Sequence, residues 1–324
     1  PLYRQEQIWI RHGIDIPRQT LSNWVQKCAT LLCKVVDAMK TIIVASNYAR
    51  ADATTVQVLK EENRDPSTKS YTWIFMTGLK TNNHIVLEYH PTRGAEAASN
   101  FFAGFQGYLQ SDAYSGYNAL RKIKGITDVG CMAHSRRKFT DVTKIVTKTG
   151  KAHEALKYIK ALYVIEDKIK NWTDDDRYQY RQEHSKIILD KFKIWLDGSI
   201  NHVPPKNPLG QAINYAINNW AALTRYLDHG MLDIDNNWCE NQIRPLALGR
   251  KNWLFMGNAK GAWSASIIYS LVVTARANGL DPWQYLMDVL TKAPHCETDV
   301  DYAKLIPTSD YFTIAPQSSC CISS

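Results

Sequence analysis

The spacing of apolar residues predicts helices at the start of the chain. Leu21, Trp24 and Val25 recur at the period of a helix, and Gly13 separates them from an earlier apolar segment. Residues 4–28 are therefore expected to form two helices joined by a tight turn, an arrangement that resembles a helix-turn-helix. An ordinary helical hairpin is the alternative, because the sequence shows no third helix of such a motif. The side chains expected on an exposed, DNA-contacting face are Arg18, Gln19, Ser22 and Asn23.

After a linking helix expected at Leu31–Val44, the apolar residues change to the period of strands. Thr54–Val58, Tyr71–Leu79 and His84–Tyr89 are separated by turn-forming residues, so a meander of three antiparallel strands is expected. The elements expected next are a helix at Ala95–Phe105, a strand at Gly107–Ala113, a short helix at Tyr117–Lys122, a strand at Thr127–Met132 and a basic helix from Ser135. This order is typical of an α/β fold of the ribonuclease-H-like type, in which helices flank a mixed sheet.

Charged amphipathic segments then interrupt this alternation and predict an all-α insertion. They include HEALKYIKALYVIEDKIKNW and YRQEHSKIILDKFKIWLDG, whereas the last 32 residues show no clear periodicity and are expected to form a tail. The expected organisation is a helix-turn-helix-like segment with its linker helix at 1–47, a first part of the core at 48–145, the insertion at 146–228, a second part of the core at 229–292 and the tail at 293–324.

Three carboxylates are the candidate catalytic and metal-binding residues: Asp52, Asp112 and Glu240. The first two each end or interrupt an apolar, strand-like run, and the two strands are neighbours in a ribonuclease-H-like sheet. The third lies in a helix-like polar segment. Such a cluster commonly holds a pair of divalent metals that act on a phosphodiester. Mg²⁺ prefers oxygen ligands, so it is the expected cofactor, with Mn²⁺ as a substitute. Any one of these carboxylates taken alone is more often a solvated side chain or a helix cap.

Basic residues follow the third carboxylate. Arg244 shares a polar helix face with Glu240, and a simple surface ion pair between the two is the plainer interpretation. Pro245 is expected to end or kink this helix. Beyond it, Arg250 and Lys251 are expected to lie near the acidic cluster, where they would clamp phosphate groups of a nucleic acid.

A Cys-x-x-His element at Cys131 and His134 raises the question of a zinc site. Structural zinc takes four ligands and no second pair is in reach, so a buried cysteine is the default interpretation of Cys131. His134 is expected to reach phosphate or a metal-bound water. The basic helix that follows it carries Arg136, Arg137 and Lys138, which are expected to contact DNA.

Composition and charge are compatible with a polyanionic partner. The 324 residues include 39 Lys and Arg against 31 Asp and Glu, giving a net charge of +8, although many basic enzymes bind no nucleic acid. The seven scattered cysteines suggest reduced thiols in the cytosol. We find no signal peptide and no apolar run long enough to span a membrane. The chain opens on Pro1 without a Met, and is therefore interpreted as a fragment or a processed product.

Several long motifs resemble the DDE transposases of the IS66 insertion-sequence family. They are QSDAYSGYNAL, GCMAHSRRKF, DNNWCENQIRPLALGRKNWLFMGNAKGA and IYSLVVTARANGLDPWQYLMDVL. The resemblance runs from the helix-turn-helix to about residue 290. It implies a ribonuclease-H-like core, magnesium-dependent cleavage at transposon ends and joining of the freed 3′-hydroxyl to target DNA. Carried over by position, the acidic triad is Asp52, Asp112 and Glu240, and His134 has an auxiliary role.

The sequence departs from this family in two respects. The family usually has Ala-Asp-Glu-Thr at the first acidic residue, where this chain has Ala53 in place of Glu. A coiled-coil segment and a Cys-rich zinc-binding module that precede the helix-turn-helix in full-length members are not found. The expected function is thus a transposase acting on DNA in the bacterial cytoplasm, associated with the nucleoid, as a homo-oligomer and without a membrane. The alternatives are a DNA-binding remnant without catalysis and a ribonuclease-H-like nuclease.

Overall fold

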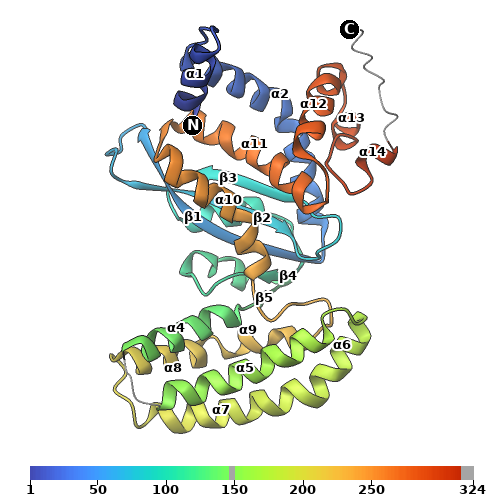
Figure 1. Cartoon of the computed structure of the whole chain (residues 1–324). Helices are drawn as coiled ribbons and strands as arrows, with labels where there is room; N and C mark the ends of the chain where they lie inside the picture. The colour runs from blue at the N-terminus through green and yellow to red at the C-terminus, as the bar shows by residue number, and fades with distance from the viewer. Residues whose placement is uncertain (146–149, 315–324) are drawn as a thin grey trace. The chain divides into compact units, whose positions relative to one another are not determined.

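The computed structural model describes residues 1–145 and 150–314 of the chain (Figure 1). These residues divide into two compact units. The first contains Pro1–Ser46, Ala51–Gly104 and the described residues from Asn241, and the second contains Asn47–Arg50 and Phe105–Glu240. Residues 146–149 of the expected insertion and 315–324 of the expected tail lie outside the described residues. The protein is a mixed α/β structure with one six-stranded sheet, as the sequence predicts at this coarse level.

Two helices open the first unit. Helix α1 (Leu2–Arg11) is followed by a turn at Gly13, whose φ of 75° lies in the left-handed region, and α2 (Arg18–Ala45) then runs for 28 residues. The separate linking helix predicted from Leu31 is wrong, because no Gly or Pro interrupts α2 and the two predicted helices are one. The pair packs as a hairpin, so the helix-turn-helix remains a prediction.

Strands of the first unit form one side of the sheet. They are β1 (Tyr48–Lys60), β2 (Lys69–Thr77), β3 (Ile85–His90) and β6 (Met256–Asn258). The order in the sheet is β3-β2-β1-β4-β5, with β6 parallel to the end of β1 at Val58. Strands β2 and β3 are antiparallel, with Trp73 opposite Glu88. The three predicted strands are therefore confirmed in number and order.

Helix α11 (Ala259–Ala277) packs along the edge strand β3 (Figure 1). The Thr274 hydroxyl accepts a hydrogen bond from the Ile85 backbone N–H and donates one to the Ile85 carbonyl, each at 3.1 Å. The Ser270 hydroxyl accepts from the Leu87 backbone N–H at 2.8 Å. The backbone N–H and C=O groups on the open edge of β3 would otherwise lack partners. The Thr274 and Ser270 hydroxyls supply hydrogen-bond partners for some of them.

The remaining helices of the first unit are α3 (Ala95–Phe101), α12 (Pro282–Lys292), η5 (Ala293–His295), α13 (Asp299–Ala303) and α14 (Tyr311–Ile314). Helix α3 ends before Phe105, because the chain turns at Gly104 with a φ of 84°. Between residues 293 and 314, where the sequence shows no clear periodicity, the chain forms short helices. These helices are too short to show a period, and in one of them the Thr298 side chain caps the Asp301 backbone N–H. No helix among the described residues is long and apolar enough to cross a membrane.

Parallel strands begin the second unit. The first residues of β1 pair with β4 (Gly107–Gln110), and β4 pairs with β5 (Ile126–Val129). Two 3₁₀ turns lie between β4 and β5, η1 (Ser115–Tyr117) and η2 (Leu120–Lys122), where a short helix was predicted. Both strands are shorter than predicted. Strand β5 stops before Met132 because α4 (Met132–Ile145) already begins there.

Helices make up the rest of the second unit, as the sequence predicts for residues 150–228. They are α5 (Lys151–Ile169), α6 (Asp174–Tyr180), the π-helical turn η3 (Arg181–Ser185), α7 (Lys186–Ile200), α8 (Pro208–Asn218), α9 (Trp220–Thr224) and η4 (Arg225–Leu227). Helices α4, α5, α7 and α8 pack side by side (Figure 1) around a core that includes Phe139, Leu162 and Phe192. Helix α10 (Asn237–Trp253) starts at the end of this unit and continues through Pro245, which does not end it.

Candidate metal centre

Two helix starts in the second unit carry the candidate site. Cys131 precedes α4, His134 lies in the first turn of α4, and Glu240 lies in the first turn of α10. The backbone joins these two starts: the Met132 N–H donates to the Ile234 carbonyl at 3.0 Å. This bond ties the start of α4 to the segment that leads into α10.

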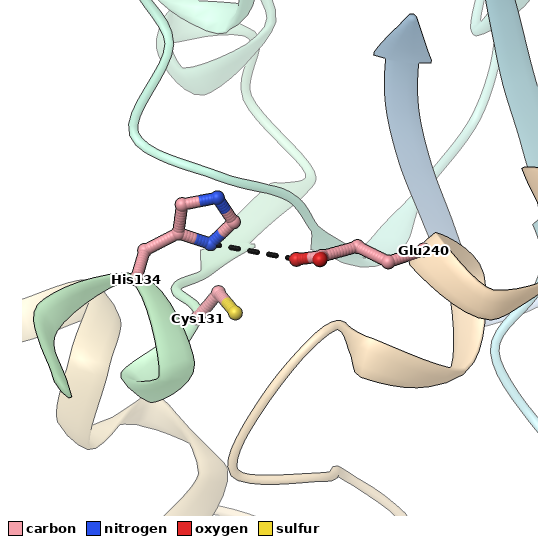
Figure 2. A group of neighbouring side chains, drawn as sticks. All are labelled: Cys131, His134 and Glu240. Carbon is pink, nitrogen blue, oxygen red and sulfur yellow. Dashed lines mark ion pairs between the residues drawn. The ribbon is translucent and has the colours of Figure 1, made fainter. Parts of the chain in front are cut away.

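Figure 2 shows the His134 ring and the Glu240 carboxylate pointing toward one another, with Cys131 beside them. His134 Nδ1 lies 3.6 Å from Glu240 Oε1, and Arg137 Nη2 lies 3.5 Å from Glu240 Oε2. The ligand atoms of Cys131, His134 and Glu240 all lie within 4.8 Å of one another. His134 Nδ1 and Glu240 Oε1 are buried, and neither has a hydrogen-bond partner. Burying such polar atoms costs folding free energy unless another group or an ion interacts with them.

Burial controls the charge states of this cluster. Desolvation lowers the pKa of His134 below its ordinary value, although the nearby carboxylates of Glu240 and Asp112 oppose this shift. The imidazole is therefore mostly neutral near pH 7, the form in which histidine binds metals. Desolvation also raises the pKa of the Cys131 thiol to about 12, so without a metal this sulfur is protonated.

Buried polar contacts hold the segment that leads into Glu240. Arg50, which is only 1% exposed, places Nη2 2.6 Å from Asp233 Oδ2 and donates to the Asp235 carbonyl at 3.2 Å. The Tyr163 hydroxyl donates to Asp235 Oδ2 at 2.7 Å, and the Gln110 amide donates to the Asp233 carbonyl at 2.8 Å. Asp235 Oδ1 in turn accepts from the Asn237 N–H at the start of α10. This network orients the first turn of the helix that carries Glu240.

Asp112 belongs to the same unit and follows the end of β4 directly. Its Oδ1 accepts a hydrogen bond from the Tyr114 backbone N–H at 3.1 Å, and its carbonyl accepts from Arg121 at 2.8 Å. Asp112 and Cys131 line one small cavity of about 10 Å³, together with Tyr215. The structure thus brings Asp112 to the neighbourhood of the cluster without making it one of the three close ligands.

Asp52 lies on β1 in the first unit. Its Oδ1 accepts a hydrogen bond from the Ala53 backbone N–H at 2.7 Å, and the residue is half-buried. Since Asp112 and Glu240 belong to the second unit, the meeting of all three carboxylates remains a prediction.

The side chains predicted to bind DNA lie on three helices, α4 in the second unit, and α2 and the part of α10 from Asn241 in the first. Arg136, Arg137 and Lys138 are exposed on α4, although Arg136 lies over the Tyr163 ring and Lys138 over the Tyr215 ring. The other residues predicted to bind DNA lie on α2 and α10. On α2, Arg18, Gln19 and Asn23 are exposed and Ser22 is half-buried. On α10, Arg244 and Lys251 are exposed and Arg250 is half-buried.

Arg250 is engaged within the first unit. Its guanidinium donates to Thr55 Oγ1 at 2.9 Å and to the Thr55 carbonyl. On α2, the Gln19 amide donates to Asn23 Oδ1 at 3.1 Å, so these two side chains brace each other on the exposed face. Whether any of these groups contacts DNA remains a prediction.

Sequence reasoning missed part of this site. Cys131 was assigned to the core alone, yet its sulfur lies beside the two other ligand atoms. Arg50 and Tyr163 were not singled out, because a buried ion pair such as Arg50–Asp233, between residues 183 apart, leaves no periodic signal. The Asp-x-Asp spacing of Asp233 and Asp235, just before a helix start, was the sequence feature that could have indicated this polar network.

Comparison with known proteins places the chain among transposase sequences. The family model described as "Transposase IS66 family" matches residues 1–264, and the model described as "IS66 C-terminal element" matches residues 270–308. Two relatives from Sinorhizobium fredii (strain NBRC 101917 / NGR234) are named as uncharacterized proteins. The relative y4jD is 30% identical over 316 residues, which are 93% of this chain and 61% of the relative. The relative y4qI is 31% identical over 305 residues, 90% of this chain and 56% of the relative. The chain thus spans about three fifths of the length of these relatives.

Proposed function

We propose, from the premise that this chain belongs to the transposase IS66 family, that it is a transposase that cleaves and joins DNA strands with divalent metal ions. The match across residues 1–264 carries this proposal. It extends through the segment that contains all three carboxylates of the predicted triad. The fold proposed for the core is ribonuclease-H-like, and the strand order β3-β2-β1-β4-β5 supports it.

The proposed ligands of Mg²⁺ are Asp52, Asp112 and Glu240. Arg50 pairs with Gln110 where β1 and β4 run in parallel. Asp52 lies two residues beyond Arg50 on β1, and Asp112 lies two residues beyond Gln110, just after β4 ends. This register supports the proposal that both carboxylates act together. Glu240 fits the role of a ligand because its buried Oε1 has no hydrogen-bond partner. The other ligand atoms within 4.8 Å of it are a sulfur and an imidazole nitrogen, however, which Mg²⁺ does not favour.

The chain's own residues supply orientation and charge. The chemistry provided by bound Mg²⁺ is activation of an attacking water or 3′-hydroxyl and stabilisation of the leaving oxygen. Arg137, 3.5 Å from Glu240 and exposed, is placed to pair with a phosphate beside the carboxylate. His134 is held mostly neutral by burial, so Nδ1 can accept a proton near the reacting phosphate.

DNA is the proposed partner, as the family implies. The net charge of +8 and the exposed basic side chains of α4 support binding to a phosphate backbone. A transposase holds two DNA ends, so assembly of two or more copies on DNA is part of the proposal. Ala53 supports one alternative, a DNA-binding remnant without catalysis, because the family usually has a carboxylate at this position.

Replacing Asp112 distinguishes the transposase from the remnant. With Mg²⁺, the chain is expected to nick a supercoiled plasmid that carries its gene and the flanking DNA. The Asp112→Asn variant should lose at least about 10²-fold of that rate, the scale on which removal of one catalytic electrostatic group acts. The exposed Asp167 on α5 offers a matched control, and Asp167→Asn should nick at the rate of the unmodified chain. Equal nicking by the Asp112 variant, or none by the unmodified chain, contradicts the proposal.

A further inference from the structure

The ligand atoms around Glu240 differ from those that Mg²⁺ prefers. Cys131 offers a sulfur, His134 an imidazole nitrogen and Glu240 a carboxylate oxygen, all within 4.8 Å of one another. Mg²⁺ binds oxygen almost exclusively, whereas mixed sulfur, nitrogen and oxygen ligands suit Zn²⁺ and related borderline ions. We propose that Cys131, His134 and Glu240 form a second metal site, which binds a transition-metal ion of the Zn²⁺ class with solvent in the remaining position.

The geometry is close to the one such an ion requires. Zinc bonds of about 2.0–2.3 Å place the donor atoms of a tetrahedral site roughly 3.3–3.8 Å apart. His134 Nδ1 and Glu240 Oε1 are already 3.6 Å apart, too far for a hydrogen bond and suited to an ion between them. The sulfur needs to approach by about 1 Å or less, since no pair in the cluster exceeds 4.8 Å.

Two buried polar atoms at this site favour a bound cation. His134 Nδ1 and Glu240 Oε1 are shielded from solvent, and neither makes a hydrogen bond. They do not satisfy each other, because their separation of 3.6 Å is too long for a hydrogen bond. A cation bound by both atoms would satisfy the two together.

The backbone holds these ligands at fixed positions. The Asn236 N–H donates to Cys131 Sγ at 3.2 Å, an N–H···S contact that would stabilise negative charge on the sulfur. The Glu240 N–H donates to the Asn236 carbonyl at 3.1 Å, and the His134 N–H donates to the Cys131 carbonyl at 3.2 Å. Residues 131 and 134 on one helix start and residue 240 on the other are therefore linked through Asn236.

Metal binding at this site releases one proton. The Cys131 thiol, protonated in the free chain, loses its proton to solvent as the sulfur–metal bond forms. No oxidation or reduction takes place.

Cobalt absorption tests the proposal, because a thiolate bound to Co²⁺ gives a charge-transfer band that oxygen and nitrogen ligands do not give. The reference chain should carry Cys320→Ser and Cys321→Ser, which removes two neighbouring thiols that could bind cobalt by themselves. We expect this band in the reference chain on adding Co²⁺, and its loss on adding Zn²⁺. Absence of the band from the folded reference chain would overturn the proposal.

Variants then assign the ligands. Cys131→Ser should remove the band, whereas the matched variant Cys239→Ser, which changes another buried cysteine of the same unit, should keep it. His134→Gln should weaken Co²⁺ binding by at least about tenfold, the least that loss of even a supporting group around a metal costs. A band that persists in Cys131→Ser would overturn the proposal, whatever the folding of the other variants.

This site does not depend on the proposed transposase activity. Asp52→Asn is expected to leave the cobalt band unchanged, even where DNA cleavage fails. The consequence for catalysis rests on the proposed function: an ion of the Zn²⁺ class would draw Glu240 away from Mg²⁺ and occupy His134 Nδ1, the atom proposed there to accept a proton.

Discussion

Replacing Arg181 by methionine is expected to destabilise the protein by about 3–5 kcal/mol, because it leaves a buried carboxylate without its main partner. Arg181 is fully buried, and its guanidinium binds both Glu166 oxygens, with Nη2 at 2.6 Å and Nε at 2.9 Å. It also donates to the carbonyls of Tyr226 and Leu232 at 3.0 and 2.9 Å. One side chain therefore connects α5, η4 and the segment that leads to Glu240. Urea unfolding measured by circular dichroism gives the change in free energy.

An exposed ion pair of similar length provides the control. Lys193 Nζ lies 2.6 Å from Asp197 Oδ2 on α7, but the two side chains are 35% and 52% exposed. Lys193→Met should cost no more than about 0.5 kcal/mol, as is usual for such helix pairs. The double variant Arg181→Met, Glu166→Gln should recover part of the loss, since the buried charge is gone. Equal effects of Arg181→Met and Lys193→Met would contradict the importance assigned to burial.

Replacing Glu240 by glutamine is expected to reduce metal-dependent DNA cleavage by at least about 10²-fold, because it removes a proposed Mg²⁺ ligand. The variant keeps the size of the side chain and its position in the first turn of α10. It should also lower the pKa of His134 further, since the Glu240 charge is one of the effects that raise it. Plasmid nicking measures the first effect, and the NMR titration of the imidazole measures the second.

The pair Glu183 and His184 offers the matched control for Glu240. Its Oε2–Nδ1 distance is 3.9 Å, and both side chains are largely exposed. Glu183→Gln should leave both DNA cleavage and the His134 titration unchanged. An unchanged His134 titration in Glu240→Gln would show that the two side chains are not in contact.

The sequence predicted elements that local patterns encode. The apolar runs in Tyr71–Leu79 and His84–Tyr89 correspond to β2 and β3 in the structure, where consecutive residues are buried. The charged amphipathic runs of the insertion correspond to α5 and α7, because one face of each helix is buried. Element ends were less predictable. Strand β4 stops at Gln110 rather than Ala113, and the turn that follows depends on hydrogen bonds from Arg121 and Tyr114 that no periodicity reveals.

The candidate site was only partly accessible from the sequence. His134 and Glu240 were singled out separately, but their contact depends on two helix starts joined through Ile234, which is a tertiary feature. Arg50 illustrates the same limit. Its burial against Asp233 arises from the pairing of β1 with β4, and an arginine two residues before Asp52 looks like any other basic residue in a sequence.

Strand transfer tests the central claim most directly, because joining a DNA end to a target distinguishes a transposase from a nuclease and from a remnant. The substrate is a duplex from the flanking DNA with a free 3′-hydroxyl, incubated with a target plasmid and Mg²⁺. The account predicts a covalent joined product with the unmodified chain and with Asp167→Asn, and none with Asp52→Asn. A joined product formed equally well by Asp52→Asn, or no product with the unmodified chain, would contradict it.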